Sequence, residues 1–197
     1  MGLWSKTTFT AYVCLFLCGA ILAGCVVHSI HPFYTAETVT ELTELYGEWK
    51  LEQSIFKEGT ENPWTISKGV IIIPRDKGGF ARLSARFFKI NDMIFLDTTA
   101  DEPQQDIDLW WMFHISPMHT VSRIITENKT LRIIPLNALW LNDAVKNKSV
   151  VLQSVWREEM KENLFIASSA EWVEFLKKYG SDQQAFPEKD AFVFTRP

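Results

Sequence analysis

The chain has 197 residues, of which 47% are hydrophobic and 22% are charged, and its formal net charge at pH 7 is −4. A chain of this length can form one folded domain with a sizeable hydrophobic core. The slightly acidic balance, without a concentrated basic patch, disfavours nucleic acid as a partner.

The first 25 residues have the three parts of a secretory signal. Lys6 and the free amino terminus form a polar head, an apolar stretch covers residues 11–22, and two small residues precede Cys25. The sequence Leu22-Ala23-Gly24-Cys25 resembles the lipobox of bacterial lipoproteins at all four positions. This resemblance implies that Cys25 receives diacylglycerol, that the peptide is cut before it, and that the new amino terminus is acylated. The alternative is an uncleaved signal anchor, because the apolar residues 11–27 reach the lower edge of the ~17–25 residues that span a bilayer.

The cysteines and the residue after Cys25 refine this expectation. Cys14 and Cys18 lie within the signal, so the mature chain would keep only the acylated cysteine and could form no internal disulfide. Val26 occupies the position at which an Asp retains lipoproteins in the inner membrane of many Gram-negative bacteria. The resemblance therefore predicts an envelope protein held to the membrane by acyl chains. In a Gram-negative host, the outer membrane facing the periplasm is favoured.

The segment after Cys25 has no sustained alternation of polar and apolar residues. Pro32 also prevents a regular interior strand or helix from passing through it. The sequence therefore divides into a signal peptide at 1–24, a lipidated amino terminus and tether at 25–44, and one mainly β domain at 45–197. On this division, deletion of residues 1–43 is expected to leave a folded, monomeric domain.

From Tyr46 onwards, short runs rich in β-branched and aromatic residues alternate with turn signals, the pattern of successive β-strands. Asn91-Asp92 is the two-residue turn of a predicted hairpin whose first strand follows the Gly78-Gly79 turn, and Glu127-Asn128-Lys129 separates two later strands. In chain order, the runs that predict strands are "LYGEWKLEQSIF" (45–56), "WTISKGVIIIP" (64–74), "FARLSARFFKI" (80–90), "MIFLDTT" (93–99), "LWWMFHI" (109–115), "TVSRIIT" (120–126), "TLRIIPL" (130–136), "VVLQSVW" (150–156), "NLFIAS" (163–168) and "AFVFT" (191–195).

Two helices are predicted late in the chain. In "NALWLNDAVKN", Asn137 can cap a helix whose apolar stripe contains Trp140, Leu141, Ala144 and Val145. The second helix begins with a capping box between Ser168 and Glu171, carries Trp172, Val173, Leu176 and Tyr179 on one face, and ends at Gly180. The predicted fold is mainly β: an antiparallel, lipocalin-like barrel or sandwich with two late α-helices. A parallel α/β fold is disfavoured because few helices separate the early strands.

Two landmarks resemble a group of uncharacterised bacterial lipoproteins. These are "SIHPFYT" (29–35), which follows the lipobox closely, and "LYGEW" (45–49). The later stretches "FLD" (95–97), "HISPMHTVSRI" (114–124), "ALWL" (138–141) and "EFLKKY" (174–179) fit the same group. The Gly47-x-Trp49 motif also resembles the opening strand of lipocalins, in which this Trp closes one end of the barrel. That resemblance implies that Trp49 lies inside the barrel, and that Gly47 allows close approach of the backbone.

The histidines are the first place to seek catalytic or metal-binding chemistry. His28 and His31 lie in the expected tether, and His114 and His119 flank Ser116. A zinc site needs three or four converging ligands, and the sequence contains no motif that brings the two pairs together. Ser116 lacks the G-x-S-x-G setting of a hydrolase nucleophile. We therefore assign no catalytic residue, no metal ligand and no cofactor, and expect these histidines to be packed, hydrogen-bonded or close to the membrane surface.

Aromatic residues are the unusual part of the composition. Adjacent Trp110 and Trp111 would point to opposite faces of a strand, so one of them needs a helix, a partner or a lipid to cover it. The favoured function is thus a membrane-anchored binding or interaction module for an apolar ligand or an envelope protein. The alternative is a hydrolase or metal-dependent enzyme using His114 and His119.

Overall fold

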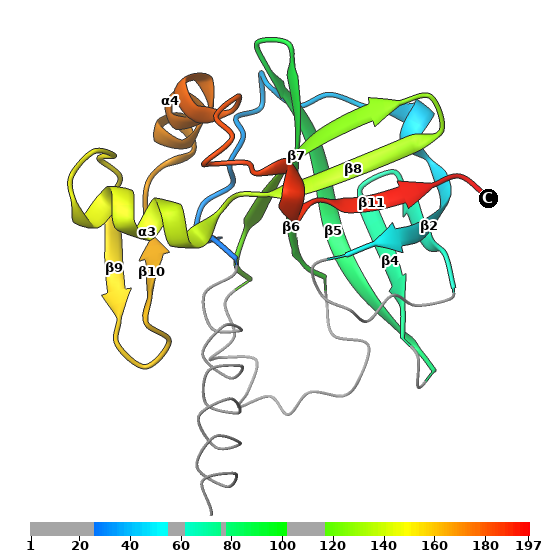
Figure 1. Ribbon diagram of the computed structural model, residues 1–197, viewed down its shortest axis with the longest axis horizontal. Coiled ribbons are helices and arrows are strands. Elements are labelled where there is room, and N and C mark those ends of the chain that lie inside the picture. The colour runs from blue at the N-terminus through cyan, green and yellow to red at the C-terminus, as the bar shows by residue number, and fades with distance from the viewer. Residues whose placement is uncertain (1–25, 55–61, 76–77, 102–116) are drawn as a thin grey trace, which may run out of the picture.

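The computed structural model describes residues 26–54, 62–75, 78–101 and 117–197 (Figure 1). Eight strands form a closed antiparallel barrel in the order β11-β2-β3-β4-β5-β6-β7-β8, so the predicted mainly β fold is confirmed. The strands are β2 (Gly47–Gln53), β3 (Trp64–Ser67), β4 (Val70–Pro74), β5 (Phe80–Ile90), β6 (Met93–Ala100), β7 (Thr120–Glu127), β8 (Thr130–Pro135) and β11 (Phe192–Thr195).

A smaller unit lies on the outside of the barrel, at the left of Figure 1. It contains a three-stranded sheet in the order β1-β10-β9 and the two predicted helices. Its elements are β1 (His28–Ser29), α3 (Ala138–Lys146), β9 (Ser154–Arg157), β10 (Glu162–Phe165) and α4 (Ser169–Tyr179). Short 3-10 helices, η1 (Thr43–Leu45) and η2 (Glu188–Asp190), precede β2 and β11. The chain between β8 and β11 therefore leaves the barrel, builds this unit together with β1 and returns to close the barrel.

Strand alternation produces two hydrophobic cores. On β5, Phe87 belongs to the cluster inside the barrel, whereas Phe88 belongs to the cluster between barrel and helices. Leu96 and Phe95 divide in the same way on β6. Successive side chains point to opposite faces of a strand, so these strands are buried on both sides. The helices cover the outer face that a simple barrel would expose to water.

Trp49 lies in the barrel core, where the sequence predicted it. The residue is 3% exposed, and its indole N–H donates to the carbonyl of Leu45 over 2.8 Å. The guanidinium of Arg196 lies 4.9 Å from the Trp49 ring centroid, within the range of a cation–π interaction. Gly47 plays a different part from the one expected. A Cβ there would meet no atom within 4 Å, and its φ of +122° is the reason that glycine suits the position.

The segment expected to be a tether is instead part of the folded domain. Val27, Ser29 and Phe33 are at most 2% exposed. We call residues 28–40 the N-terminal strap because they cross the outer face of the barrel from β7 to β5 (Figure 1, blue). Local alternation did not reveal the strap because it pairs with other strands at isolated positions. Its anchoring contacts are made by backbone and buried side chains far away in the sequence.

The strap is fixed at both ends by backbone pairing. At one end, Ser29 forms an antiparallel bridge with His119, with N···O distances of 3.0 and 2.8 Å. At the other end, Val39 bridges Phe88 of β5. β1 also pairs in parallel with β10, so the strap connects the small sheet to the barrel. Buried strap residues such as Phe33 belong to the same hydrophobic cluster as Phe88 of β5 and Trp172 of α4.

Two predicted strands differ in extent from the structure. The run at 64–74 is a β3–β4 hairpin rather than one strand, and its turn contains Gly69 at a φ of +75°. The run beginning at Val150 becomes regular only at Ser154. The strand predicted at 109–115, with Trp110 and Trp111, lies outside the described residues.

The second helix is confirmed in detail. Ser168 and Glu171 form the predicted capping box, and Trp172 is fully buried on the inner face of α4. Gly180 stands at the C-cap with φ −62°, which is not the left-handed conformation that usually selects glycine there. A Cβ at Gly180 would lie 2.8 Å from Phe95 and 2.9 Å from Met93. Glycine is required here because the helix end packs closely against β6.

Candidate functional site

Two regions could carry function: the surroundings of His119, which the sequence singled out, and a groove beside α4. Cys25, the predicted lipidation site, and His114, the second histidine of the enzyme alternative, lie outside the described residues. His31 is exposed on the strap, whereas His28 is half-buried in β1. The described histidines do not converge on one centre: His119 pairs with Asp97 and His28 pairs with Glu162.

His119 forms a close pair with a buried carboxylate. Its Nδ1 lies 2.8 Å from Oδ1 of Asp97, a residue that is 2% exposed. The second oxygen of Asp97 accepts the backbone N–H of Phe33 over 2.9 Å. Asp97 on β6 thus contacts both the strap and His119, the residue just before β7. Such an arrangement satisfies a buried charge that would otherwise be costly.

The hydroxyl of Ser29 belongs to the same network, but it is fully engaged. It donates to the carbonyl of His31 over 2.8 Å and accepts the indole N–H of Trp172 over 2.9 Å and the backbone N–H of His31 over 3.1 Å. A serine hydroxyl has one donor and two acceptor positions. Ser29 therefore joins the strap to Trp172 of α4, and the donor and both acceptor positions of its hydroxyl are occupied.

The rest of this region supports a structural role. Burial, and secondarily the negative charge of Asp97, raises the pKa of Tyr34, while Arg86 opposes that rise. Within the described ranges, no group of three or more His, Cys, Asp or Glu residues could hold a metal ion. We call the contacts of Asp97 with His119 and with the Phe33 N–H the latch between strap and barrel.

A second polar cluster joins β1 to the β9–β10 hairpin. Glu162 is 4% exposed, and its Oε1 lies 3.2 Å from His28 Nδ1. Arg157 on β9 also forms an ion pair with Glu162. Because one carboxylate binds groups from both neighbouring strands, the cluster fixes the start of the strap to the hairpin.

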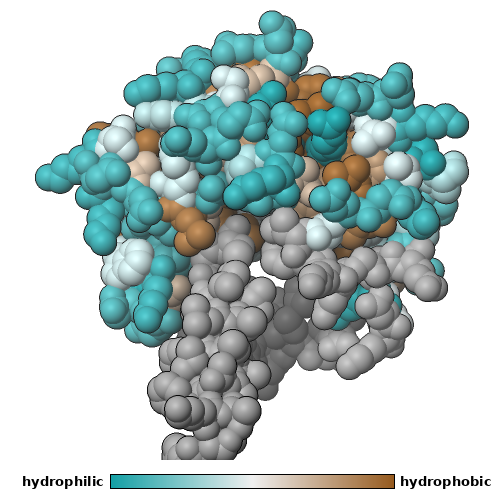
Figure 2. Space-filling view, viewed as in Figure 1, coloured by the Kyte–Doolittle hydropathy of each residue, from teal (hydrophilic) through white to brown (hydrophobic). Residues whose placement is uncertain are grey.

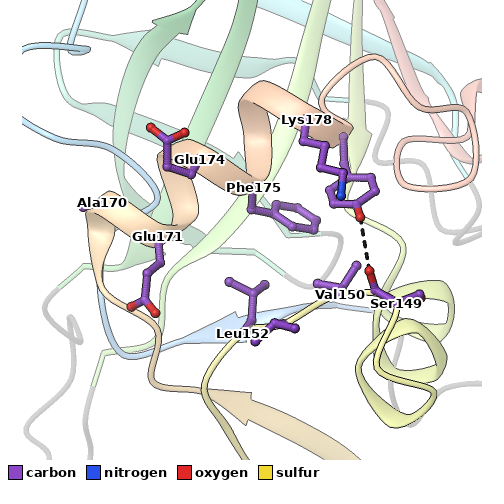
Figure 3. A pocket seen from close by; sticks show the side chains of 10 residues that line it. Ser149, Val150, Leu152, Ala170, Glu171, Glu174, Phe175 and Lys178 are labelled. Carbon is purple, nitrogen blue, oxygen red and sulfur yellow. Dashed lines mark hydrogen bonds between the residues drawn. The ribbon is translucent and has the colours of Figure 1, made fainter.

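The described surface exposes few large hydrophobic side chains in any one place on the face that Figure 2 shows. The face in Figure 2 is mostly hydrophilic, and its hydrophobic residues form small separate patches. A hollow of about 480 Å³ lies outside the barrel, between α4 and residues 149–152 (Figure 3). We call it the α4 groove. Its volume falls within the ~300–1,000 Å³ typical of ligand sites.

The α4 groove combines an apolar base with an exposed apolar wall. Val150, Leu152 and Phe175 line it and are 5–9% exposed, whereas Val151 is 89% exposed. Figure 3 shows Phe175 projecting from α4 toward the segment that contains Val150 and Leu152. The hydroxyl of Tyr179 donates to the Ser149 carbonyl over 3.4 Å and ties the two walls together at one end. An apolar group entering the groove would remove Val151 from water.

Charged side chains of α4 border this apolar base. Glu171, Glu174 and Lys178 also line the groove, and all three are exposed. The backbone N–H and hydroxyl of Ser168 donate to Glu171 and hold its pKa below the usual 4.5. Lys178 lies 4.9 Å from the Tyr179 ring centroid. The groove thus offers both signs of charge around an apolar base, which suits an amphipathic partner.

Sequence reasoning did not identify the α4 groove. The capping box and apolar stripe correctly predicted α4, but residues 150–152 were assigned to a strand. The signal that could have found the groove is the adjacent pair Val150-Val151, because one of two neighbours in an extended segment points away from the core. α4 begins at Ser169, far from this pair in the sequence, and local pattern alone could not show that the two lie opposite each other.

Comparisons of the chain with protein-family models, curated proteins and solved structures found no match. The described part of the chain includes no helix with the length and apolar character needed to cross a membrane. The eight-stranded barrel and its helical cover define the class of protein as a mainly β fold.

Proposed function

We propose that this protein is a bacterial envelope lipoprotein, attached through acylated Cys25, whose domain binds a partner in the α4 groove. The Leu-Ala-Gly-Cys sequence at 22–25 supports the anchor. In a Gram-negative host, Val26 after the cysteine favours the outer membrane, with the domain in the periplasm. The partner is an apolar ligand or an apolar segment of an envelope protein.

One observation carries the binding role: Val151 is 89% exposed beside a buried apolar base. Exposed apolar side chains next to a hollow gain free energy when a partner covers them. The barrel interior supports the same choice because large side chains, including Trp49, Phe87 and Phe194, form its core cluster. The groove therefore offers the better-supported ligand site among the described residues.

The anchor is tested by Cys25→Ser in the full-length protein. This change is expected to block processing and acylation and to release the protein from the membrane fraction. Three acyl chains hold far more strongly than one, since each buried CH₂ contributes about 0.8 kcal/mol. Mass spectrometry that finds an unmodified thiol on Cys25 of the native protein would contradict the anchor.

The groove is tested by Val151→Glu, with Leu139→Glu as a matched control. Leu139 is 67% exposed on α3 and does not line the groove, so both changes put a carboxylate on an exposed apolar position. Binding of the apolar dye 1-anilinonaphthalene-8-sulfonate is expected to weaken in Val151→Glu only. For a protein partner, a photo-crosslinker at 151 should form an adduct in intact envelopes, and one at 139 should not. Equal results at both positions would refute the groove as the binding site.

A further inference from the structure

The distance between the predicted anchor and the folded domain is very short. Val27 is 2% exposed, so the chain is buried in the domain two residues after Cys25. Consecutive Cα atoms are at most ~3.8 Å apart, which keeps the Cα atoms of Cys25 and Val27 within about 8 Å. An acylated Cys25 must lie at the lipid headgroups. The domain would therefore touch the membrane rather than extend from it on a tether.

The register of the small sheet shows which end of the β9–β10 hairpin lies next to the start of β1. β1 runs parallel to β10, with His28 opposite Leu164 and Ser29 opposite Phe165. The amino-terminal end of β1 thus lies at the amino-terminal end of β10. That end of β10 follows the turn of the β9–β10 hairpin, at residues 158–161. The same hairpin is held to β1 by the contacts of Glu162 with His28 and Arg157.

The hairpin exposes side chains suited to a membrane interface. Val155 and Trp156 are each 51% exposed and Met160 is 48% exposed, so three of the eight large hydrophobic residues exposed on the described surface belong to this one hairpin. Val155 and Trp156 are neighbours on β9 and point to opposite faces of the sheet, so both faces of the hairpin expose an apolar side chain. The Trp156 indole donates to Glu158, which gives the ring a polar end and an apolar body. Such amphipathic rings are enriched where headgroups meet hydrocarbon.

We propose that the β9–β10 hairpin lies on the surface of the phospholipid bilayer beside acylated Cys25, with the α4 groove directed away from the membrane. This orientation rests on the proposed anchoring at Cys25. Residues 150–152 precede β9, and the hairpin turn follows it. Val151 and Arg157 are six residues apart, which allows a separation of at most about 20 Å at 3.3 Å per residue. In Figure 1, α4 and the hairpin turn lie at opposite ends of the small unit.

The orientation assigns different tasks to the two ends. The hairpin and the acyl chains hold the domain at one membrane surface, and the groove remains open to a partner in the adjoining aqueous space. Because the strap is latched to the barrel through Asp97, the whole domain shares this orientation. A groove facing the membrane would instead be covered by lipid.

The experiment uses the acylated protein in vesicles of phosphatidylethanolamine and phosphatidylglycerol, with or without a headgroup nitroxide lipid. Cys25 is the only cysteine after the signal, so Met160→Cys and Val151→Cys each add one reactive thiol for a fluorophore. Both positions are exposed, and neither change disturbs the core. The nitroxide is expected to quench the label at 160 and to leave the label at 151 unchanged.

The outcomes separate the orientation from the anchor. Acylated Cys25, confirmed by mass spectrometry, with no quenching at 160 would overturn the orientation and leave the anchor intact. Quenching at 151 equal to or greater than that at 160 would also overturn it. An unmodified Cys25 and a protein absent from the vesicles would overturn both proposals. Melting curves that match the unlabelled protein show that the labelled proteins are folded.

Discussion

Replacing Trp49 with Ala tests the barrel core most directly. The Trp49 side chain is 3% exposed, donates to the carbonyl of Leu45 over 2.8 Å and packs beneath the guanidinium of Arg196. Truncation to Ala removes the ring, its hydrogen bond and the cation–π contact together. It also leaves a void within a closed barrel whose strands cannot collapse freely around it.

The cost follows from the buried area. A buried Trp removes roughly 150–250 Å² from water, which corresponds to about 4–6 kcal/mol at about 25 cal/mol per Å². This value is an upper limit because the unfolded chain already buries part of its surface. We therefore expect Trp49→Ala to lower the free energy of unfolding by about 3–5 kcal/mol, as is typical of such substitutions. That is a large share of the ~5–15 kcal/mol that stabilises a domain.

Urea titration of the domain from residue 26, followed by circular dichroism, measures this loss. Trp156→Ala is the matched control because Trp156 is 51% exposed, and its change should cost below about 1 kcal/mol. Trp49→Phe should fall between them, because it keeps most of the volume but loses the hydrogen bond to Leu45, worth about 1 kcal/mol. A loss below about 1 kcal/mol for Trp49→Ala would refute the assignment of Trp49 to the barrel core.

Three further changes test the strap and α4. Asp97→Ala leaves the Phe33 N–H without its acceptor, so it should lower the free energy of unfolding in urea by at least about 1–3 kcal/mol. A change within about 0.5 kcal/mol, the range of ordinary surface substitutions, would contradict the latch. Removal of residues 26–40 should abolish cooperative melting, whereas removal of 1–24 should not; a cooperative melt after both would show that the strap is dispensable. Because the pKa of Glu171 is lower in the folded protein than its usual 4.5, its carboxylate stabilises the fold fully above pH 4.5. This stabilisation is lost as the pH falls through the pKa of Glu171 in the folded protein. The urea midpoint of Glu171→Gln should therefore approach that of the unchanged protein at acid pH. A difference between the two midpoints that does not change with pH would refute a stabilising role for the Glu171 charge.

Elements whose signals are local could be predicted from the sequence. The β5–β6 hairpin turns at Asn91-Asp92, where Asn91 has a φ of 54°, and Asn128 plays a similar part with a φ of 55° between β7 and β8. The α4 capping box involves residues three apart. In each case, a few neighbouring side chains determine the backbone conformation, so no knowledge of the tertiary fold is needed.

Features that depend on distant contacts could not be predicted. Asp97 and His119 lie 22 residues apart, and Phe33 lies 64 residues from Asp97, so nothing near Phe33 in sequence shows that its N–H is buried on a carboxylate. The β3–β4 hairpin was not predicted for another reason. Its turn falls at Lys68-Gly69 inside an apolar run, and that run reads as one strand unless the positive φ of Gly69 is known.

The structure also separates residues that define the fold from residues available to a partner. The polar contacts of Ser29, Asp97 and His119 join the strap, the barrel and α4. A buried polar group with all its partners in place stabilises one arrangement of the chain, because each lost partner leaves a costly unpaired group. A binding surface needs the opposite property, exposed area whose burial awaits a second molecule. Val151 in the groove and Trp156 on the hairpin have that property, which is why both proposals place function on the small unit and assign the histidine network to stability.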